Sequence, residues 1–242
     1  SPMEVSPTAH YSMGGIVVTA EEHWTGVEGL YAAGEVTAGL HGANRLGGNS
    51  LAEILIFGKR AGDAASKHSK EIDVHIRSKE VIQKAHENLN SSIKNGTEVA
   101  RPLQRDLRNI MWEYGGVVKN EEKLKKGLDE IKSLKNASKD LDVRPDSEGY
   151  QDLMLAFDLE ASIISSEATL LSALSREESR GAHQREDFKD LKKDQALNIR
   201  IELEKDSNIK LSKDKTPPLR KELKNLIDKT EEIKNYEGML LE

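Results

Sequence analysis

Glycine is distributed very unevenly along the 242 residues, and this distribution most limits what the chain can fold into. Most of the 18 glycines lie in residues 1–70, whereas residues 71–242 are rich in Lys and Glu. Dense glycine marks places where the backbone turns tightly or approaches another group closely. We therefore expect a first part rich in loops and a remainder built from helices with solvated outer faces.

The composition is typical of a soluble globular protein, with 36% hydrophobic and 32% charged residues. A net charge of −6 argues against nucleic acid as a partner. The chain contains no cysteine, which excludes disulfides, thiolate metal sites and iron–sulfur clusters held by this chain. The first residues include neither an initiator Met nor the apolar region of a signal peptide. We expect the chain to be a piece of a longer protein.

Residues 1–70 show the pattern of a strand–loop–helix unit. A β-branched run at 15–19 predicts a short strand, and the apolar run at 29–35 predicts a second strand buried on both faces. A glycine-rich loop follows at 39–48. Ser50 and Glu53 then have the spacing of a capping box, which predicts a helix that begins near Asn49.

The remainder contains four stretches with helical periodicity, at 72–93, 102–114, 124–134 and 150–174. Helices that each carry one apolar stripe pack into an antiparallel bundle. Alternation at 197–203, a turn at 206–208 and a return at 209–211 predict a β-hairpin, followed by a charged helix or tail. We expect Trp24 and Trp112 to pack in the interior. The fold class is therefore α+β, mainly α, with domains at 1–70, 71–176 and 177–242.

Physical chemistry points to an anion site beside the predicted strand–loop–helix unit. Glu35 stands where a strand ends, and a carboxylate there can accept hydrogen bonds from a ribose diol. The helix that begins near Ser50 presents unpaired N–H groups and a positive dipole end. Arg45, just before it, can clamp a carboxylate. Taken singly, Glu35 also suits a salt bridge and Ser50 an N-cap, so these residues alone name no reaction.

Three strings of residues, at 7–16, 29–36 and 41–53, closely resemble the flavoprotein subunit of succinate dehydrogenase and fumarate reductase. The likeness weakens through the helical region and strengthens again at 178–187. It implies the C-terminal remnant of an FAD-binding α/β domain, then the helical bundle, then a small segment with the hairpin. The implied activity is interconversion of succinate and fumarate by hydride transfer to or from FAD.

The resemblance also implies roles for individual residues. His10 and Arg45 match residues that hold a carboxylate of the dicarboxylic acid. The implied contacts to FAD are Gly34 and Glu35, followed at the helix start by Asn49, Ser50 and Leu51. The resemblance gives no role to His41, although it lies in a matching string.

The motifs that the family needs for the dinucleotide and for proton transfer lie upstream of these strings. No G-x-G-x-x-G follows a predicted strand here. We therefore expect no catalytic residue and no metal ligand in this chain, and we expect the chain alone to bind FAD weakly and to show no turnover.

Two alternatives stay open, an enzyme similar to L-aspartate oxidase and a structural or interaction module without catalysis. The resemblance further implies an iron–sulfur partner subunit, together with a cytoplasmic location in which the membrane is reached only through partner subunits. His183, Arg180 and Arg185 either anchor the last segment to another surface or form structural ion pairs.

Overall fold

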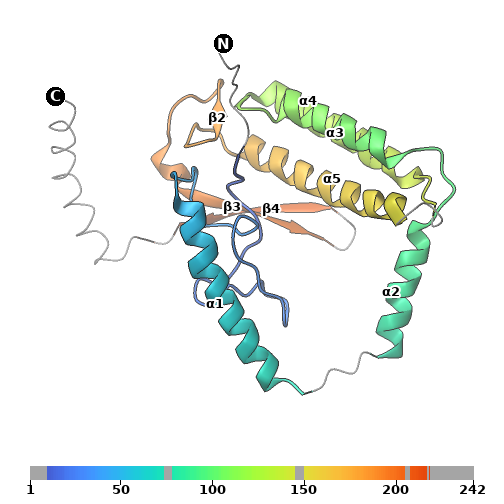
Figure 1. Cartoon of the computed structure of the whole chain (residues 1–242). Helices are drawn as coiled ribbons and strands as arrows, with labels where there is room; N and C mark the ends of the chain where they lie inside the picture. Colours follow the sequence, from blue (N-terminus) through green and yellow to red (C-terminus); the bar gives the residue numbers. More distant parts are fainter. Residues whose placement is uncertain (1–9, 74–77, 145–149, 205–207, 217, 219–242) are drawn as a thin grey trace, which may run out of the picture. The chain divides into compact units, whose positions relative to one another are not determined.

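The computed structural model describes residues 10–73, 78–144, 150–204, 208–216 and 218. Five helices dominate it, and Figure 1 labels them: α1 (Asn49–Glu71), α2 (Lys79–Ser92), α3 (Ala100–Tyr114), α4 (Glu121–Ala137) and α5 (Gln151–Ser175). The mainly helical α+β class is confirmed. The chain divides into two compact units, at 1–190 and 191–242, and each is described by itself. The predicted domain limits at 70 and 176 stay predictions.

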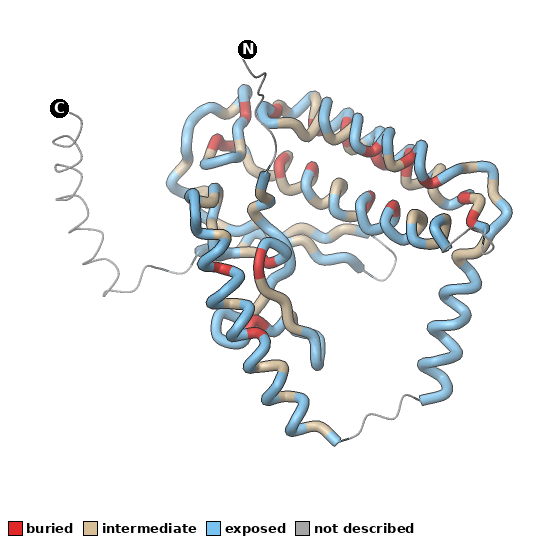
Figure 2. Tube along the Cα trace, in the orientation of Figure 1, coloured by how far each residue is buried: buried red, intermediate tan, exposed pale blue. Residues whose placement is uncertain are grey.

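Helices α3, α4 and α5 enclose the hydrophobic core of the first unit. Leu124 and Ile131 of α4 and Leu159 and Leu170 of α5 are fully buried, and Figure 2 shows buried positions along all three helices. The apolar stripes read from the sequence therefore form the bundle as predicted. Asn120 caps α4 by accepting a hydrogen bond from the Lys123 N–H at 2.8 Å, which satisfies one of the free donors at the helix start.

Two expectations about the helical region are wrong. The first predicted helix, realised as α2, adds nothing to the core, since none of its residues is buried. Trp112 of α3 is 84% exposed rather than packed. It lies five residues beyond Leu107, which places it about 140° around the helix from that core position. Apolar residue type alone did not reveal the face on which these side chains lie.

The two strands predicted in the glycine-rich part do not form. Within residues 15–19 and 29–35 the described β-pairing consists of isolated bridges, Ile16 with Thr37 and Trp24 with Tyr31. Left-handed backbone at Gly29 and Gly34, with φ of +74° and +84°, interrupts the second run. Trp24, expected in the interior, is exposed. Leu30 of the run expected to be buried on both faces is also exposed, as are Ile16 and Val17 of the first run.

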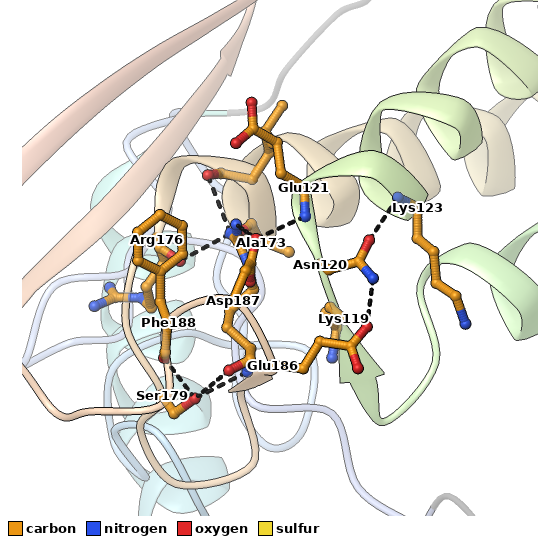
Figure 3. Close-up of polar contacts among 12 residues, drawn as sticks. Lys119, Asn120, Glu121, Lys123, Ala173, Arg176, Ser179, Glu186, Asp187 and Phe188 are labelled. Atoms are coloured by element: carbon orange, nitrogen blue, oxygen red, sulfur yellow. Dashed lines mark hydrogen bonds and ion pairs between the residues drawn. The ribbon is translucent and has the colours of Figure 1, made fainter.

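A short parallel pair of strands connects the bundle to the segment that follows it. β1 (Val118–Lys119) pairs with β2 (Gln184–Arg185) in the register Val118 with Gln184. Beside this pair, the Asn120 side chain bonds to Glu186, and the Glu121 N–H donates to Asp187 Oδ2 at 2.8 Å (Figure 3). The start of α4 is therefore fixed to residues more than sixty positions later in the chain.

Arg185 is the largest of the fully buried side chains. Its Nη1 donates to the carbonyl oxygens of Ala173 and Arg176 at 2.8 and 3.1 Å, at the end of α5. Its Nε and Nη2 donate to the two oxygens of Asp187, each at 2.7 Å. These bonds satisfy the free carbonyls of a helix end and neutralise a buried charge.

The neighbouring charges are also structural. Buried Glu178 accepts hydrogen bonds from Arg176 at 2.7 Å and from Arg180 at 2.8 Å. His183 Nε2 lies 3.3 Å from the Arg176 carbonyl oxygen. Burial lowers the pKa of His183, so the neutral ring is favoured. Of the two roles considered for Arg180, His183 and Arg185, the geometry supports the structural one.

The second unit contains an antiparallel hairpin, β3 (Leu197–Leu203) with β4 (Ile209–Lys215). The register runs from Leu197 with Lys215 to Leu203 with Ile209, and the predicted alternation of half-buried and exposed residues holds along β3. Part of the predicted turn and almost all of the terminal segment lie outside the described residues. The described residues also include two short 3-10 turns, η1 (Ser138–Asp140) in the first unit and η3 (Lys193–Gln195) in the second.

Candidate functional site

Three segments meet around the start of α1: residues 10–16, the loop at 34–48 and the first turn of the helix itself. The backbone N–H of Ser12 donates to Glu35 Oε1 at 2.8 Å, and that of Ile16 donates to the Val36 carbonyl at 2.8 Å. Two predicted site residues, His10 and Glu35, are thereby brought into the same small region, and His10 itself is exposed.

Glu53 is the site residue whose environment the sequence did not reveal. It is only 2% exposed, and its Oε2 accepts from the Tyr11 hydroxyl and from His41 Nε2, the latter at 2.9 Å. Burial raises the pKa of Glu53, but the hydrogen bonds from Tyr11 and His41 outweigh it, so the pKa lies below its ordinary value. Burial and the bond to Glu53 raise the pKa of Tyr11 to about 12.

The capping box predicted from Ser50 and Glu53 is therefore wrong. Helix α1 has Gly48 at its N-cap, with φ of 80°, and no side chain caps its first turn. The Glu53 carboxylate cannot reach back to the helix start because Tyr11 and His41 hold it in the interior. The N–H groups of Asn49 and Leu51 donate to the carbonyls of Leu46 and Gly48. A helix start without a side-chain cap still presents its positive dipole end to an anion or an electron-rich ring.

Arg45 lies next to that helix start with its guanidinium above the ring of Tyr11, 4.6 Å from the ring centroid. Its Nη1 donates to the carbonyl of Leu46 at 3.1 Å. Its Nε is buried and has no acceptor among the described residues. A guanidinium N–H without an acceptor in a buried position suits the oxygen of a carboxylate ligand.

The residues predicted to contact FAD lie along the same helix start. Gly34 faces α1, since a Cβ built on it would lie 3.4 Å from Ile54 Cγ2. Ser50 is half-buried, whereas Asn49 and Leu51 are exposed. A close glycine, an adjacent carboxylate at Glu35 and an uncapped helix end fit one side of a flavin with its ribose. Each assignment to these residues remains a prediction.

The loop that carries Arg45 is also held from the far end of the first unit. The Ala182 N–H donates to the Ala43 carbonyl at 2.9 Å. Gly181 adopts φ of +56°, and a Cβ on it would lie 2.4 Å from the same oxygen. The predicted likeness at 178–187 gave a signal that this segment matters, but not that it contacts the Arg45 loop.

Comparison with protein family models shows to which family this chain belongs. Residues 104–234 match the family model described as fumarate reductase flavoprotein C-term, which covers more than half of the chain. The chain belongs to this flavoprotein family. Residues 1–51 match the FAD binding domain family, as expected for the remnant of such a domain. The resemblance read from the three sequence strings is confirmed.

Individual relatives agree with the family assignment. A Methanocaldococcus jannaschii protein described as an uncharacterized FAD-dependent oxidoreductase is 41% identical over 83% of this chain. A Methanothermobacter marburgensis protein, named as one of the subunits of fumarate reductase (CoM/CoB), is 39% identical over 77% of the chain. The chain spans only 36% and 34% of these two relatives, or about a third of their length.

A solved structure of E. coli quinol fumarate reductase FrdA, in a mutant form, superposes with a TM-score of 0.81. It is 30% identical in sequence, and the match covers 91% of this chain and 40% of that chain. The arrangement of helices described above is therefore that of a fumarate reductase flavoprotein. In the part of the chain that the structure describes, no helix is both long and apolar enough to cross a membrane.

Proposed function

We propose that the whole protein of which this chain is a part interconverts fumarate and succinate, and that this chain supplies the side of the site that holds a carboxylate. The observation that carries the proposal is the guanidinium of Arg45. It is fixed over Tyr11, it has a buried N–H without an acceptor among the described residues, and it lies beside an uncapped helix start. These features together suit a carboxylate above an electron-accepting ring.

In this proposal the residues of the chain bind and orient. Arg45 and His10 hold one carboxylate of the dicarboxylic acid, which fixes the substrate and draws electron density from its double bond. Gly34 and Glu35 lie against FAD, and the first turn of α1, at Asn49, Ser50 and Leu51, stabilises negative charge on the flavin ring. Bound FAD supplies the hydride or accepts it. We assign no proton-transfer role to any residue of this chain.

The decisive experiment uses the full-length protein loaded with FAD. Replacing Arg45 with Lys keeps the charge but loses the paired donors, and we expect kcat/KM for fumarate to fall at least about a hundredfold. Arg60→Lys is the matched control, because Arg60 of α1 also lies over an aromatic ring, that of Phe57, but outside the candidate site. The proposal fails if both variants retain the kinetics of the original protein.

The same preparations test the competing activity. An enzyme similar to L-aspartate oxidase would oxidise aspartate in preference to succinate, and assays with both acids separate the two. For the 242-residue chain alone, we expect no stoichiometric flavin absorption after purification in the presence of FAD, because about two thirds of the length of its relatives is missing from it.

We further propose an iron–sulfur protein as the partner, with a cytoplasmic location at a membrane reached only through partners. The support is chemical, since the chain contains no cysteine to hold a cluster that would carry electrons away from a flavin. The relative from Methanothermobacter marburgensis is itself named as one subunit of its enzyme. Purification of the intact protein under native conditions, followed by iron and sulfide analysis of the proteins that copurify, tests this assignment.

A further inference from the structure

We propose that Tyr11, Glu53 and His41 form a positioning network that fixes the guanidinium of Arg45 in its binding orientation. This inference rests on the proposed function, because it takes Arg45 as the group that holds the substrate carboxylate. The sequence assigned none of the three network residues to substrate or cofactor binding, since Glu53 was read only as part of a capping box, and none is proposed to touch the substrate.

The network joins the three segments of the site through a single carboxylate oxygen. Tyr11 comes from the segment at 10–16, His41 from the loop at 34–48, and Glu53 from the first turns of α1. Oε2 of Glu53 accepts from both of the others. The Tyr11 and His41 rings also meet edge to face, with centroids 5.3 Å apart and planes at 85°. Each of the three side chains is thus restrained by the other two.

Arg45 is restrained mainly by the Tyr11 ring. The guanidinium carbon lies 4.6 Å from the ring centroid, a distance at which a cation is attracted to the face of an aromatic ring. The other contact of the guanidinium is to the carbonyl of the next residue, Leu46, which moves together with the loop. The hydroxyl bond to Glu53 sets the angle of the Tyr11 ring, and the ring in turn sets where the guanidinium lies.

The charge states suit a static support rather than a proton relay. The pKa of Tyr11 is raised to about 12 and the pKa of Glu53 is lowered, so a phenol and a carboxylate persist throughout the neutral range. Among the described residues Arg45 forms no ion pair with a carboxylate, so Glu53 supports it without neutralising it. The positive charge of Arg45 is therefore kept for a ligand.

The test compares Tyr11→Phe and Glu53→Gln in the full-length, FAD-loaded protein. Tyr11→Phe keeps the ring and removes only the hydroxyl. In both variants we expect the dissociation constant for fumarate, followed by the perturbation of flavin absorbance, to rise about tenfold. FAD content should be unchanged, and kcat should change by less than about threefold.

Two control variants carry the same chemical change outside the network. Tyr31→Phe removes a hydroxyl from a ring that lies beside His68, and Glu71→Gln removes a charge from the exposed last residue of α1. Both should bind fumarate as the original protein does. If Glu53→Gln fails to fold, Tyr11→Phe still tests the inference because Glu53 then keeps its bond from His41.

A double-mutant cycle distinguishes positioning from a general structural role. In a protein that already carries Arg45→Lys, we expect Tyr11→Phe to weaken fumarate binding less than twofold further, because the group that it positions is gone. A full tenfold loss in both backgrounds would overturn the inference, as would network variants that bind like their controls. If the full-length protein without substitutions binds no dicarboxylate, the proposed function is refuted, and the inference that rests on it is refuted as well.

Discussion

The helical bundle and the segment at residues 10–71 are held together in different ways. The bundle of α3, α4 and α5 buries a continuous set of Leu, Ile and Val side chains. In the segment at 10–71 the buried side chains are those of His23, Thr37, Glu53 and Ala61, and three of these are polar. Figure 2 makes the contrast visible, with buried positions dense on the bundle and sparse along α1.

This difference separates the part that supplies most of the apolar burial from the part that contains the candidate site. Packing of apolar side chains is the main favourable contribution to folding, and here the bundle provides it. The candidate site instead depends on hydrogen bonds between residues far apart in sequence, such as Tyr11 with Glu53. Meanwhile Leu51, Ile54, Leu55 and Ile56 of α1 are all more than half exposed, so this helix contributes little apolar burial.

The largest expected effect comes from truncating a leucine in each region, which tests whether the bundle contributes more to stability than α1. Leu124→Ala removes a fully buried side chain of α4 and should lower the free energy of unfolding by about 2–5 kcal/mol. Leu55→Ala on α1, where the side chain is 73% exposed, should change it by less than about 0.5 kcal/mol. Urea unfolding of the 242-residue chain, followed by circular dichroism, gives both values. Equal losses would contradict the division.

A second prediction concerns the contact between the bundle end and the Arg45 loop. Gly181→Ala places a methyl group against the Ala43 carbonyl at a left-handed residue, and we expect a loss of about 2–4 kcal/mol. Hydrogen exchange should quicken at the Ala182 amide and through residues 41–48. Gly62→Ala, at a helical glycine of α1 with open space around it, is the control and should be neutral or slightly stabilising.

The smallest expected effect concerns the polar contacts at the end of α5. They should make the free energy of unfolding depend on pH. The Arg185 guanidinium lowers the pKa of Asp187 to about 2, whereas an unfolded Asp titrates near 3.9. The pair therefore contributes about 2 kcal/mol, fully present above pH ~4 and lost as the pH falls through ~2. Urea unfolding between neutral pH and pH ~2 should show this loss in the original chain. Asp187→Asn should lack this component of the pH dependence, and an unchanged profile would contradict the assignment.

The sequence predicted those parts of the fold that local patterns determine. Three of the four periodic stretches became the helices of the bundle, because their apolar spacing of three and four residues leaves one face to bury. Alternation likewise located β3, and the stretch predicted from Pro102 begins two residues after the observed start of α3 at Ala100. Trp112 and α2 show the limit, since an apolar residue does not specify whether another surface lies opposite it.

For the candidate site, the sequence indicated candidate residues, whose roles stay predictions, but not the contacts among them. Arg45, Glu35 and Ser50 were found from their positions relative to a loop and a helix start. Glu53 was misread as a cap because its true partner, Tyr11, lies 42 residues away, and no local pattern encodes such a contact. At 15–19 and 29–35 the pairing stops at isolated bridges, and left-handed backbone at Gly29 and Gly34 interrupts the second run.

The bond from Ala182 to Ala43 also has a consequence for the order of events during synthesis. The two residues are separated by about 140 positions, and a ribosome adds about 5–20 residues each second. About ten seconds therefore pass between synthesis of the loop that carries Arg45 and synthesis of Ala182, which donates the hydrogen bond to it. During that interval the bundle helices can assemble, because their contacts come from within the stretch already made. The hydrogen bond from Ala182 to this loop can form only after all three bundle helices have been synthesised.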